Sequence, residues 1–579
     1  MSNATAPSMT TVVTRCSYCA LQCALQLSVD NATGRVVKAV GSKAHAPTFG
    51  LACVKGLNAH LQLGHGQRLQ TPLKRVGDSF EPITWDEALD LAAEGMQRVQ
   101  AAHGRDAMTV YGSGALNNES IYLLAKFART VLGTANIDYN GRYCMSAAAA
   151  AHNAVLGQDR GLPFPLADFA LARCIVLVGA NVAECLPPIG VQLRQARLKG
   201  QKVVLIDPRP GASSALVDLH LKPRPGTDLA LGLALLREID QQGGLDVLYL
   251  KARCSGWELA LSAVQACTPA WCEGISSVPE AQLRQLAAWL IESRPSLILT
   301  GRGAEQHVRG PETAMAFLQV ALSLGQMGIP GGGFGTLTGQ GNGQGGREQG
   351  QKADQLPGYR RIADSADREA VAKVWQVEAQ SLPQAGLSAQ ELFSAKHRHE
   401  VRGLWVLGAN PAVSAANARE ARESLAGLDF LMVSDLFMSE TAQMAHLVLP
   451  AAAFAEETGT MTNLEGRVVL RSAVTSPPRG SPAGLADHRS HGPALRPWPA
   501  LSIRECQRGF RRIRPLHRGR QGGLQRHGPC SPVPRSGLVL ALPQRRASWH
   551  RAPLPRSLRP CRWPGPLSDL DLGGTRRRA

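Results

Sequence analysis

The stretch CIVLVGANVAECLPPIGVQLRQARLKGQKVVLIDPRP, residues 174–210, decides the fold. Its first part, CIVLVGA (174–180), is an apolar run typical of a buried strand, and a Gly-Ala-Asn turn follows it. IGVQLRQARLKG (189–200) has the spacing of a helix that ends in glycine, and QKVVLIDPRP (201–210) is a second strand. Strand, helix and strand within about 35 residues predict a parallel βαβ unit.

The same pattern returns twice, in SLILTGRGAEQ (296–306) and GLWVLGANPAV (403–413). In each, a strand is followed by a turn that contains glycine. The chain therefore predicts an α/β fold with several crevices at the carboxyl ends of strands. None of these turns is G-x-G-x-x-G, so the fingerprint of NAD binding is absent.

A glycine-rich segment, GIPGGGFGTLTGQGNGQGGREQGQKADQLPGYR (328–360), lies between the last two strands. It is either a flexible linker or backbone laid closely along a polar ligand. The interspersed polar side chains, among them Asn342, Gln344 and Arg347, favour the second interpretation.

Four cysteines gather near the N-terminus: Cys16, Cys19 and Cys23 in CSYCALQC, and Cys53 in LACVKG. Four thiolates suit either a [4Fe–4S] cluster or a structural zinc ion. Zinc sites usually comprise two separated C-x2-C pairs, whereas here three cysteines share one loop and one stands apart. This spacing favours the cluster, with zinc or unliganded buried cysteines as alternatives. A cluster would bring electrons to the rest of the chain.

The composition narrows the class of protein. The chain has 579 residues, 44% of them hydrophobic, which is enough for three or four domains. Thirteen cysteines without a secretory signal favour a reducing compartment over a disulfide framework. No apolar run approaches the roughly 20 residues of a membrane helix. We therefore expect a cytoplasmic protein that does not enter a membrane.

The net charge of +18 comes almost entirely from the C-terminal stretch. Residues 476–579 hold 21 arginines, no lysine and four acidic residues, together with 16 of the 37 prolines. The rest of the chain is nearly neutral, so the charge does not indicate nucleic-acid binding by the main body. A nucleic-acid-binding arm and ordinary disorder are two interpretations of this tail.

A reading-frame error explains the tail better. With suitable codons, RGSPAGLADHRSHGPALR, read one nucleotide later, becomes EARRRDWRIIAHMARRF, which has the pattern of an amphipathic helix. We expect residues 479–579 to be an out-of-frame, disordered tail, and we exclude them from the fold.

Eight motifs, in order, resemble those of the molybdopterin-guanine-dinucleotide oxidoreductases, and most closely the cytoplasmic assimilatory nitrate reductase catalytic subunits. The resemblance covers about residues 1–478. Its motifs are the cysteine quartet followed by VKG, then NGRYCMSAAAAAH (140–152), GANVAECLPP (179–188), IDPRP (206–210), KPRPGTDLAL (222–231), GQGNGQGGREQGQKADQLPGYR (339–360), GANPAVS (408–414) and SDLFMSETAQMAHLVLPAAAFAEETGTMTNLEGRV (434–468).

The resemblance implies roles for the matched positions. Cys144 would be the molybdenum ligand with Met145 beside it, the quartet would hold the [4Fe–4S] cluster, and Lys55 would lie between cluster and pterin on the electron path. Taken alone, Cys144 is a core residue and Lys55 a solvent-facing lysine. The residues that would cradle a Mo-bis(molybdopterin guanine dinucleotide) are Asn181, Glu184, Asp207, Gly226, Asp228, Gly339, Gln340, Gly341, Asn342, Gly345, Gly346, Arg347, Gly408, Asn410, Ser439, Glu440 and Thr441.

The implied activity is molybdenum-dependent reduction of nitrate to nitrite. Formate dehydrogenases of the family usually place a histidine after the metal-ligand residue, whereas here Met145 follows, as in nitrate reductases. The implied electron donor is an NAD(P)H-dependent reductase subunit, a ferredoxin or a flavodoxin. Three alternatives remain: a formate dehydrogenase α-subunit, a molybdenum-free electron-transfer scaffold, and an inactive truncated product.

The resemblance also implies a domain order. Residues 1–60 would form the cluster domain, 61–139 and 330–478 one molybdopterin-binding α/β domain, and 140–329 a second α/β domain that carries Cys144. The metal would lie in the cleft between the two Rossmann-like domains. The family's C-terminal β-barrel-like domain would be missing, so the chain as written would bind cofactor weakly or not at all.

Overall fold

The computed structural model describes residues 8–43, 48–477 and 561–562. It confirms the predicted βαβ unit: β8 (Cys174–Val178), α6 (Pro187–Leu198) and β9 (Lys202–Ile206) follow one another. The sheet continues with β10 (Leu219–Leu221), β12 (Ser296–Thr300) and β13 (Gly333–Thr336). Its five strands, in the order β10-β9-β8-β12-β13, are all parallel.

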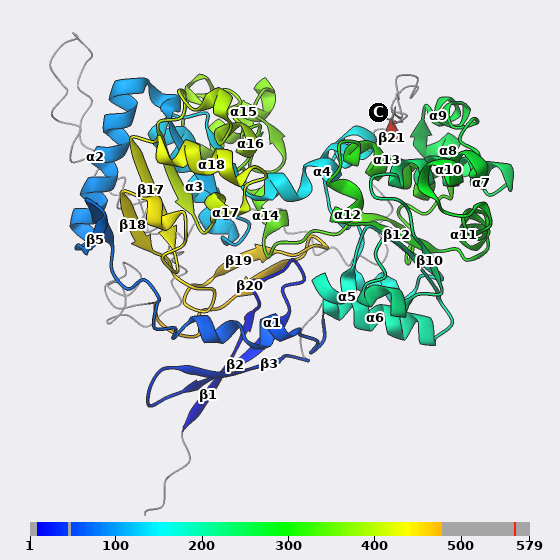
Figure 1. The fold of residues 1–579 in the computed structure, drawn as a ribbon, viewed down its shortest axis with the longest axis horizontal. Helices are drawn as coiled ribbons and strands as arrows, with labels where there is room; N and C mark the ends of the chain where they lie inside the picture. The colour runs from blue at the N-terminus through cyan, green and yellow to red at the C-terminus, as the bar shows by residue number, and fades with distance from the viewer. Residues whose placement is uncertain (1–7, 44–47, 478–560, 563–579) are drawn as a thin grey trace, which may run out of the picture.

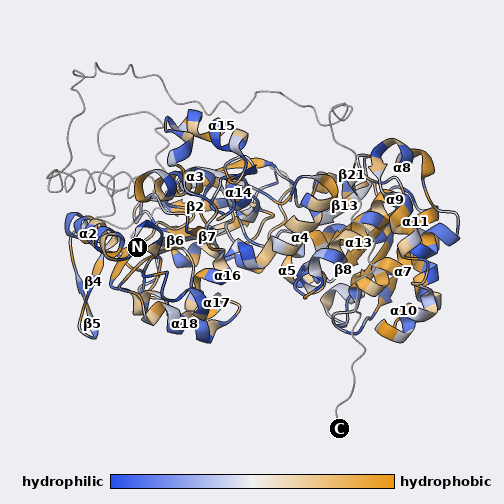
Figure 2. Ribbon diagram, turned by 90° about the horizontal axis from the view of Figure 1, so that it is seen from above, coloured by the Kyte–Doolittle hydropathy of each residue, from blue (hydrophilic) through white to orange (hydrophobic). Residues whose placement is uncertain are grey.

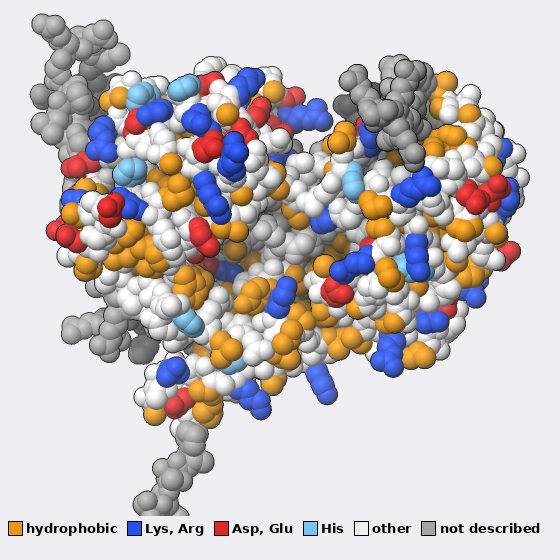
Figure 3. Space-filling view, viewed as in Figure 1, with side chains coloured by type: hydrophobic (Ala, Val, Ile, Leu, Met, Phe, Trp, Pro, Cys, Tyr) orange, Lys and Arg blue, Asp and Glu red, His pale blue; other side chains and the backbone are white. Residues whose placement is uncertain are grey.

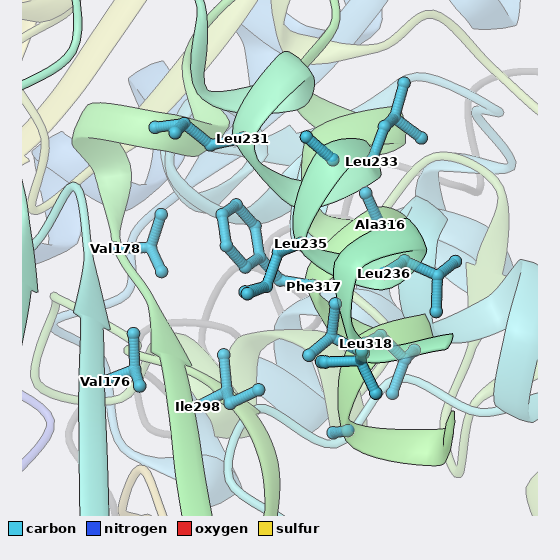
Figure 4. Close-up of a cluster of buried hydrophobic side chains, with 14 of the residues drawn as sticks. Val176, Val178, Leu231, Leu233, Leu235, Leu236, Ile298, Ala316, Phe317 and Leu318 are labelled. Carbon is cyan, nitrogen blue, oxygen red and sulfur yellow. The ribbon is translucent and has the colours of Figure 1, made fainter. Parts of the chain in front are cut away.

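A core of aliphatic side chains lies between this sheet and two helices, α7 (Asp228–Gln241) and α13 (Gly310–Ser323). Figure 4 shows Val176 and Ile298 of the sheet beside Leu235 of α7 and Phe317 of α13. The two helices pack closely because Gly232 has no side chain, and a Cβ there would lie 2.8 Å from Ala316. Both helices are mostly apolar in Figure 2, as expected of helices buried on several sides.

The second large sheet has seven strands in the order β5-β4-β18-β17-β16-β6-β7. They are β4 (Leu73–Val76), β5 (Ser79–Pro82), β6 (Met108–Gly112), β7 (Ile137–Tyr139), β16 (Gly403–Leu407), β17 (Phe430–Asp435) and β18 (Leu447–Pro450). Strands β7, β6, β16, β17 and β18 are parallel, and the β4–β5 hairpin adds an antiparallel edge.

The seven-stranded sheet joins distant parts of the chain, because strands before residue 140 pair with strands after residue 402. Strand β13, just beyond the predicted boundary at residue 330, belongs instead to the five-stranded sheet. The exact domain boundaries stay a prediction. The fold class is the expected α/β class, with two mainly parallel sheets.

Helix α2 (Trp85–His103) covers the seven-stranded sheet, and Thr84 and Glu87 begin it with a reciprocal capping box. Gly95 of α2 lets the helix approach Phe430 of β17, since a Cβ there would lie 2.5 Å from that ring. Further helices around this sheet are α3 (Asn118–Phe127), α15 (Ser365–Trp375), α16 (Ala389–Leu392), α17 (Pro411–Ser414) and α18 (Ala418–Ala426). Those around the five-stranded sheet are α5 (Val182–Cys185), α8 (Val247–Arg253), α9 (Trp257–Ala263), α10 (Pro269–Ser276), α11 (Glu280–Glu292) and α12 (Arg302–Glu305).

A small antiparallel sheet near the N-terminus comprises β1 (Met9–Arg15), β2 (Ala24–Asp30) and β3 (Val36–Gly41). Helix α1 (Val54–Leu57) lies beside it (Figure 1). The hairpin of β19 (Gly459–Thr462) and β20 (Val468–Arg471) extends from the larger body toward this sheet. Thr14 Oγ1 donates to the carbonyl of Ser472 at 2.7 Å, which ties the end of the hairpin to β1.

The two large sheets form two lobes, and α4 (Gly141–Leu156) lies between them (Figure 1). Figure 3 shows the surface hollowed between the lobes. No helix in the described part of the chain is both long and apolar enough to cross a membrane. The predicted out-of-frame tail lies outside the described residues except for 561–562, which form β21 (Cys561–Arg562) and pair with β11 (Cys254–Ser255).

Candidate functional site

The strand order of the five-stranded sheet reverses between β8 and β12. From β8 the chain adds β9 and β10 on one side, and it then adds β12 and β13 on the other. Ligands of open parallel sheets bind at the carboxyl ends of strands at such a point. Here two glycine turns pack on each other. Gly301 N donates to the carbonyl of Val178 at 2.8 Å, and Gly303 N donates to that of Gly179 at 2.9 Å. A Cβ on Gly179 would lie 2.2 Å from Ala304 N, so only glycine fits.

Predicted pterin-contact residues gather along this edge. Glu184 Oε2 accepts a hydrogen bond from Arg209 at 2.8 Å, and Asp207 Oδ1 accepts one from Arg209 N at 2.9 Å. Asn181 Oδ1 accepts from the hydroxyl of Ser213 at 2.7 Å, whereas its Nδ2 is buried and has no partner. The hydrogen bond from Arg209 lowers the pKa of Glu184.

Asp228 and Gly226 lie at the same edge, beside His307. Burial raises the pKa of Asp228 to about 6, and the nearby His307 opposes this effect. Gly226 has a φ of +83°, and a Cβ there would lie 3.7 Å from His307 Nδ1. All five residues predicted for this edge are therefore brought together around one open rim.

The strand order of the seven-stranded sheet reverses between β6 and β16. The pterin-contact residues predicted for the second half of the chain lie at this edge. Asn410 Nδ2 donates to Glu440 at 2.6 Å, and Asn410 Oδ1 accepts from the hydroxyl of Thr441 at 2.7 Å. Ser439 donates to Asp435 at 2.6 Å. Gly408 has a φ of +60°, which lets the chain turn after β16. These residues form a second rim, on the seven-stranded sheet, and their role in binding a pterin stays a prediction.

Most of the glycine-rich segment is buried rather than loose. Residues 328–330 are exposed, Gly333–Thr336 form β13, and Gly343–Glu348 form the short helix α14. A Cβ on Gly345 would lie 2.1 Å from Asn118 Oδ1, and one on Gly346 would lie 2.5 Å from the ring of Tyr139. The glycines are needed because other parts of the protein press against the backbone. A flexible linker is therefore ruled out for this stretch.

Asn342 and Gln340 in this segment differ in whether their side-chain amides have hydrogen-bond partners within the protein. Asn342 Nδ2 donates to the carbonyl of Leu116 at 2.8 Å and to Asn118 at 3.0 Å, and its Oδ1 accepts from Thr462 N at 2.8 Å. Its side chain is therefore fully used by the protein. Gln340 Oε1 is buried without a hydrogen-bond partner, so it can still accept one from a ligand.

Cys144, the predicted molybdenum ligand, lies in the first turn of α4 and is partly exposed. Gly339 lies opposite, since a Cβ on it would be 3.7 Å from Cys144 Sγ. Arg302 Nη1 donates to Cys144 Sγ at 3.6 Å, and also to the carbonyl of Cys144 and to Met145 Sδ. Thus Cys144 and Met145 share one guanidinium.

The sequence did not identify Arg302. It lies in the turn after β12, within SLILTGRGAEQ, and its side chain forms an ion pair with Glu305, which is 1% exposed. Thr300 Oγ1 donates to the other oxygen of Glu305 at 2.6 Å. Burial raises the pKa of Glu305, against the opposing effect of Arg302. The available signal was an arginine directly after a strand-end glycine at the point where the sheet changes direction.

A second buried arginine, Arg347, belongs to the short helix α14. It is 1% exposed, and its Nε is 2.8 Å from Asp159 Oδ2, while Nη1 has no partner. The charges of Asp159 and of Cys144 both act to raise the pKa of Arg347. His152, fully buried on α4, lies 3.8 Å from Asp159, and burial lowers the pKa of its imidazole to about 4. Arg347, Asp159 and His152 therefore form one buried charged cluster, and the charge of Cys144 acts on its Arg347.

Arg129 binds the backbone of the glycine-rich segment through hydrogen bonds. It is 1% exposed and donates to the carbonyls of Gly350, Lys352 and Gln355 at 2.7, 2.7 and 3.0 Å. Burial lowers the pKa of this guanidinium to about 10. Its role is to fix the course of the chain that follows the predicted pterin loop.

The predicted cluster ligands come together at the other end of this segment. Cys16 and Cys23 are each 4% exposed, and burial raises the pKa of both thiols to about 12. Cys19 and Cys53 act on both thiols in the same direction and raise their pKa further. Lys55 follows Cys53 on α1, is exposed, and its charge acts on Cys19.

The cysteine loop is joined to the glycine-rich segment by backbone. Cys19 and Gln340 form an antiparallel bridge, Ala20 N donates to the carbonyl of Gly339 at 3.0 Å, and Gln22 Nε2 donates to that of Gly341 at 2.6 Å. Gly339 also faces Cys144 Sγ. One short run of residues therefore touches both the quartet and Cys144.

The donor set fits the cofactors that the sequence implies. Cys16 and Cys23 are buried, whereas Cys19 and Cys53 are partly exposed. Buried thiols need a positively charged partner to become thiolates, and iron supplies that charge. Among the described residues, no three His, Cys, Asp or Glu side chains are arranged to hold a single metal ion. Buried polar atoms without partners, namely Asn181 Nδ2, Gln340 Oε1 and Arg347 Nη1, suit a ligand rich in hydrogen-bonding groups.

Comparison with known proteins agrees with this arrangement. The profile of the molybdopterin oxidoreductase Fe4S4 domain matches residues 9–64, and that of the molybdopterin oxidoreductases matches residues 68–481. This chain belongs to the molybdopterin oxidoreductase family. The quartet thus lies within an Fe4S4 domain, and both rims, the glycine-rich segment and Cys144 lie within the molybdopterin oxidoreductase domain.

Relatives in this family carry different names. The chain is 41% identical over 461 residues to the assimilatory nitrate reductase catalytic subunit of Bacillus subtilis, a match that covers 79% of this chain and 65% of that protein. It is 34% identical to the nitrate reductase of Synechocystis, covering 81% and 67%, and 32% identical to the F420-dependent formate dehydrogenase subunit alpha of Methanocaldococcus jannaschii, covering 81% and 68%. The chain therefore spans about two thirds of the length of these molybdopterin oxidoreductases.

A solved structure shows the same fold. Acetylene hydratase from Pelobacter acetylenicus superimposes with a TM-score of 0.69 at 21% sequence identity, over 86% of this chain and 69% of that one. At this identity the likeness concerns the fold alone.

Proposed function

We propose that this molybdopterin oxidoreductase chain is the catalytic part of a nitrate reductase. The reaction takes up nitrate, two electrons and two protons and releases nitrite and water. The observation that carries the proposal is Met145, which directly follows Cys144. The 41% identity to a protein named as an assimilatory nitrate reductase subunit supports it.

The side chain after Cys144 matters because the two candidate reactions make different demands. Oxidation of formate releases a proton, which a basic side chain beside the metal can accept. Met145 is a thioether, 1% exposed, and accepts no proton near neutral pH. Removal of an oxygen atom from nitrate needs no base at this position. When bound, a molybdopterin supplies a metal that changes oxidation state by two electrons.

The chain's own residues have distinct tasks in this proposal. Cys144 would hold the metal, and the two rims and Gln340 would hold a bis(guanine dinucleotide) form of the pterin. Cys16, Cys19, Cys23 and Cys53 would hold the cluster, and the shared backbone at 19–22 and 339–341 keeps it close to Cys144. Lys55 stays the predicted residue on the electron path, with its exposed side chain near Cys19. An electron-donating reductase subunit, ferredoxin or flavodoxin is the proposed partner.

A reduced-viologen assay of the loaded protein tests the proposal. We expect oxidation of the dye with nitrate and no dye reduction with formate. Turnover of formate without turnover of nitrate would overturn the proposal and favour the second candidate, a formate dehydrogenase, to which relatives at 31–32% identity point.

A further inference from the structure

Arg302 occupies a position that the proposed reaction needs and that no sequence motif marked. Nitrate and formate are both planar anions, and an anion enters a buried site only where a positive charge awaits it. The rim of the five-stranded sheet presents Arg302 directly to Cys144 Sγ, at 3.6 Å. Its side chain is 22% exposed, so part of the guanidinium remains accessible to solvent.

Other arginines beside α4 are already committed to the protein. Arg142 forms ion pairs with Asp138 at 2.8 Å and with Asp354 at 2.9 Å. Arg347 is 1% exposed and paired with Asp159. Arg302 also has an acidic partner, Glu305, but its remaining contacts near Cys144 are two sulfur atoms and one carbonyl, which are weak or neutral acceptors.

The ion pair with Glu305 holds the guanidinium of Arg302 in one orientation, which favours the binding of an anion. Glu305 is 1% exposed and is itself held by Thr300 Oγ1 at 2.6 Å, so the carboxylate cannot follow the guanidinium outward. Arg302 Nε is buried and has no hydrogen-bond partner. Nε is thus the unpartnered donor in the plane of the guanidinium, and a planar oxyanion can replace the sulfur and carbonyl contacts that Nη1 makes in the same plane.

We propose that Arg302 binds the substrate oxyanion beside Cys144, and that Glu305 is the positioning residue that sets the orientation of its guanidinium. This inference rests on the proposed function, because it names the residue that holds the substrate of that reaction. It assigns to the turn after β12 a role in recognising a planar anion. The competing interpretation is that the hydrogen bonds of Arg302 to Cys144 and Met145 only fasten α4 to α12.

The test compares Arg302→Gln and Arg302→Lys with the unchanged protein, all loaded with cofactor. The first readout is equilibrium binding of nitrate by calorimetry without reductant. The second is the viologen assay with nitrate and with trimethylamine N-oxide, an oxygen-atom donor without net charge. The third is molybdenum content. Arg284→Gln, which removes a surface ion pair with Glu280 at 2.6 Å, is the matched control.

We expect Arg302→Gln to raise the nitrate dissociation constant and KM by about 10- to 100-fold, the size of one lost charge-assisted hydrogen bond. Molybdenum content and KM for trimethylamine N-oxide should change by less than about threefold, since no charge is recognised there. Arg302→Lys should recover part of the nitrate affinity because it restores the charge without the planar fork. Glu305→Gln should raise KM for nitrate several-fold and leave kcat nearly unchanged.

Two results would overturn the inference. One is Arg302→Gln with full molybdenum content and unchanged nitrate binding. The other is a parallel loss of molybdenum and of both substrates in Arg302→Gln and Arg302→Lys, which assigns the residue to the structure alone. If the unchanged protein uses formate and not nitrate, the proposed function fails separately, and the same variants are then measured for formate binding.

Discussion

The cysteine quartet and the surroundings of Cys144 differ in the environment that they give a cysteine sulfur. At the quartet, burial dominates, and it raises the pKa of Cys16 and Cys23 to about 12. Around Cys144 the protein supplies positive charge itself, through Arg302 at 3.6 Å and through the more distant Arg347. The first region depends on iron to balance its thiolates, whereas the second already contains two arginine–carboxylate ion pairs, Arg302 with Glu305 and Arg347 with Asp159.

Removal of one quartet sulfur should have the largest effect. In Cys23→Ser a hydroxyl replaces a thiolate ligand, and we expect loss of the cluster's iron and sulfide and a fall of viologen-supported nitrate reduction to background. Chemical analysis of iron and sulfide measures this. Cys267→Ser, outside the quartet, is the control. Unchanged iron content in Cys23→Ser would remove Cys23 from the ligand set.

Removal of the other sulfur should separate the two regions. We expect Cys144→Ala to abolish nitrate reduction and to lower molybdenum content, while iron content stays at the level of the unchanged protein. Metal analysis and the iron–sulfur absorption of the same sample give both answers. Equal losses of iron and molybdenum would contradict the idea that the two sites load by separate chemistry.

We expect the buried ion pair of Arg347 with Asp159 to contribute to the free energy of unfolding. Asp159→Asn leaves Arg347 buried without its partner, and breaking such a pair costs about 3–5 kcal/mol. Urea unfolding of the chain measures this change. Glu280→Gln breaks an ion pair whose side chains are 52% and 29% exposed, and we expect a cost below about 1 kcal/mol. Similar costs in the two variants would contradict a special role for the buried cluster.

The same cluster should respond to acid, by a smaller amount. The pKa of His152 is lowered to about 4 in the folded chain, against about 6.5 when unfolded. Between these values the unfolded chain binds the additional proton, so stability is full above about pH 6.5 and falls as the pH drops toward 4, by about 3 kcal/mol at most. Urea unfolding at several pH values measures the slope. His152→Phe, which keeps the ring against Phe334, should lose this part of the slope.

Local patterns predicted much of this architecture. The apolar runs at 174–180, 201–210, 296–306 and 403–413 all contain strands, and the Gly-Ala-Asn turns lie at the two points where the sheets change direction. These features depend on residues that are neighbours in the sequence. The cysteine spacing likewise indicated the Fe4S4 domain, which the family match bears out.

Contacts between distant residues could not be read in the same way. Arg302 meets Cys144 across 158 positions, and Arg129 reaches carbonyls within the glycine-rich segment across more than 220. Nothing in a strand-end Gly-Arg-Gly distinguishes a site residue from a surface one. The roles of the predicted pterin contacts stay predictions, although Asn342 is now seen to be fully engaged by the protein.

The backbone bridge between Cys19 and Gln340 makes the loading of the two cofactors thermodynamically linked. Residues 19–22 include the predicted cluster ligand Cys19, and their hydrogen bonds to Gly339 and Gly341 connect them directly to the wall facing Cys144. Whatever free energy the cluster contributes to pterin affinity through this contact, the pterin must return to cluster affinity in equal measure. Because the contact shares no metal ligand, a saturated site keeps its metal when the other is empty, and the linkage appears only as a change in that site's affinity.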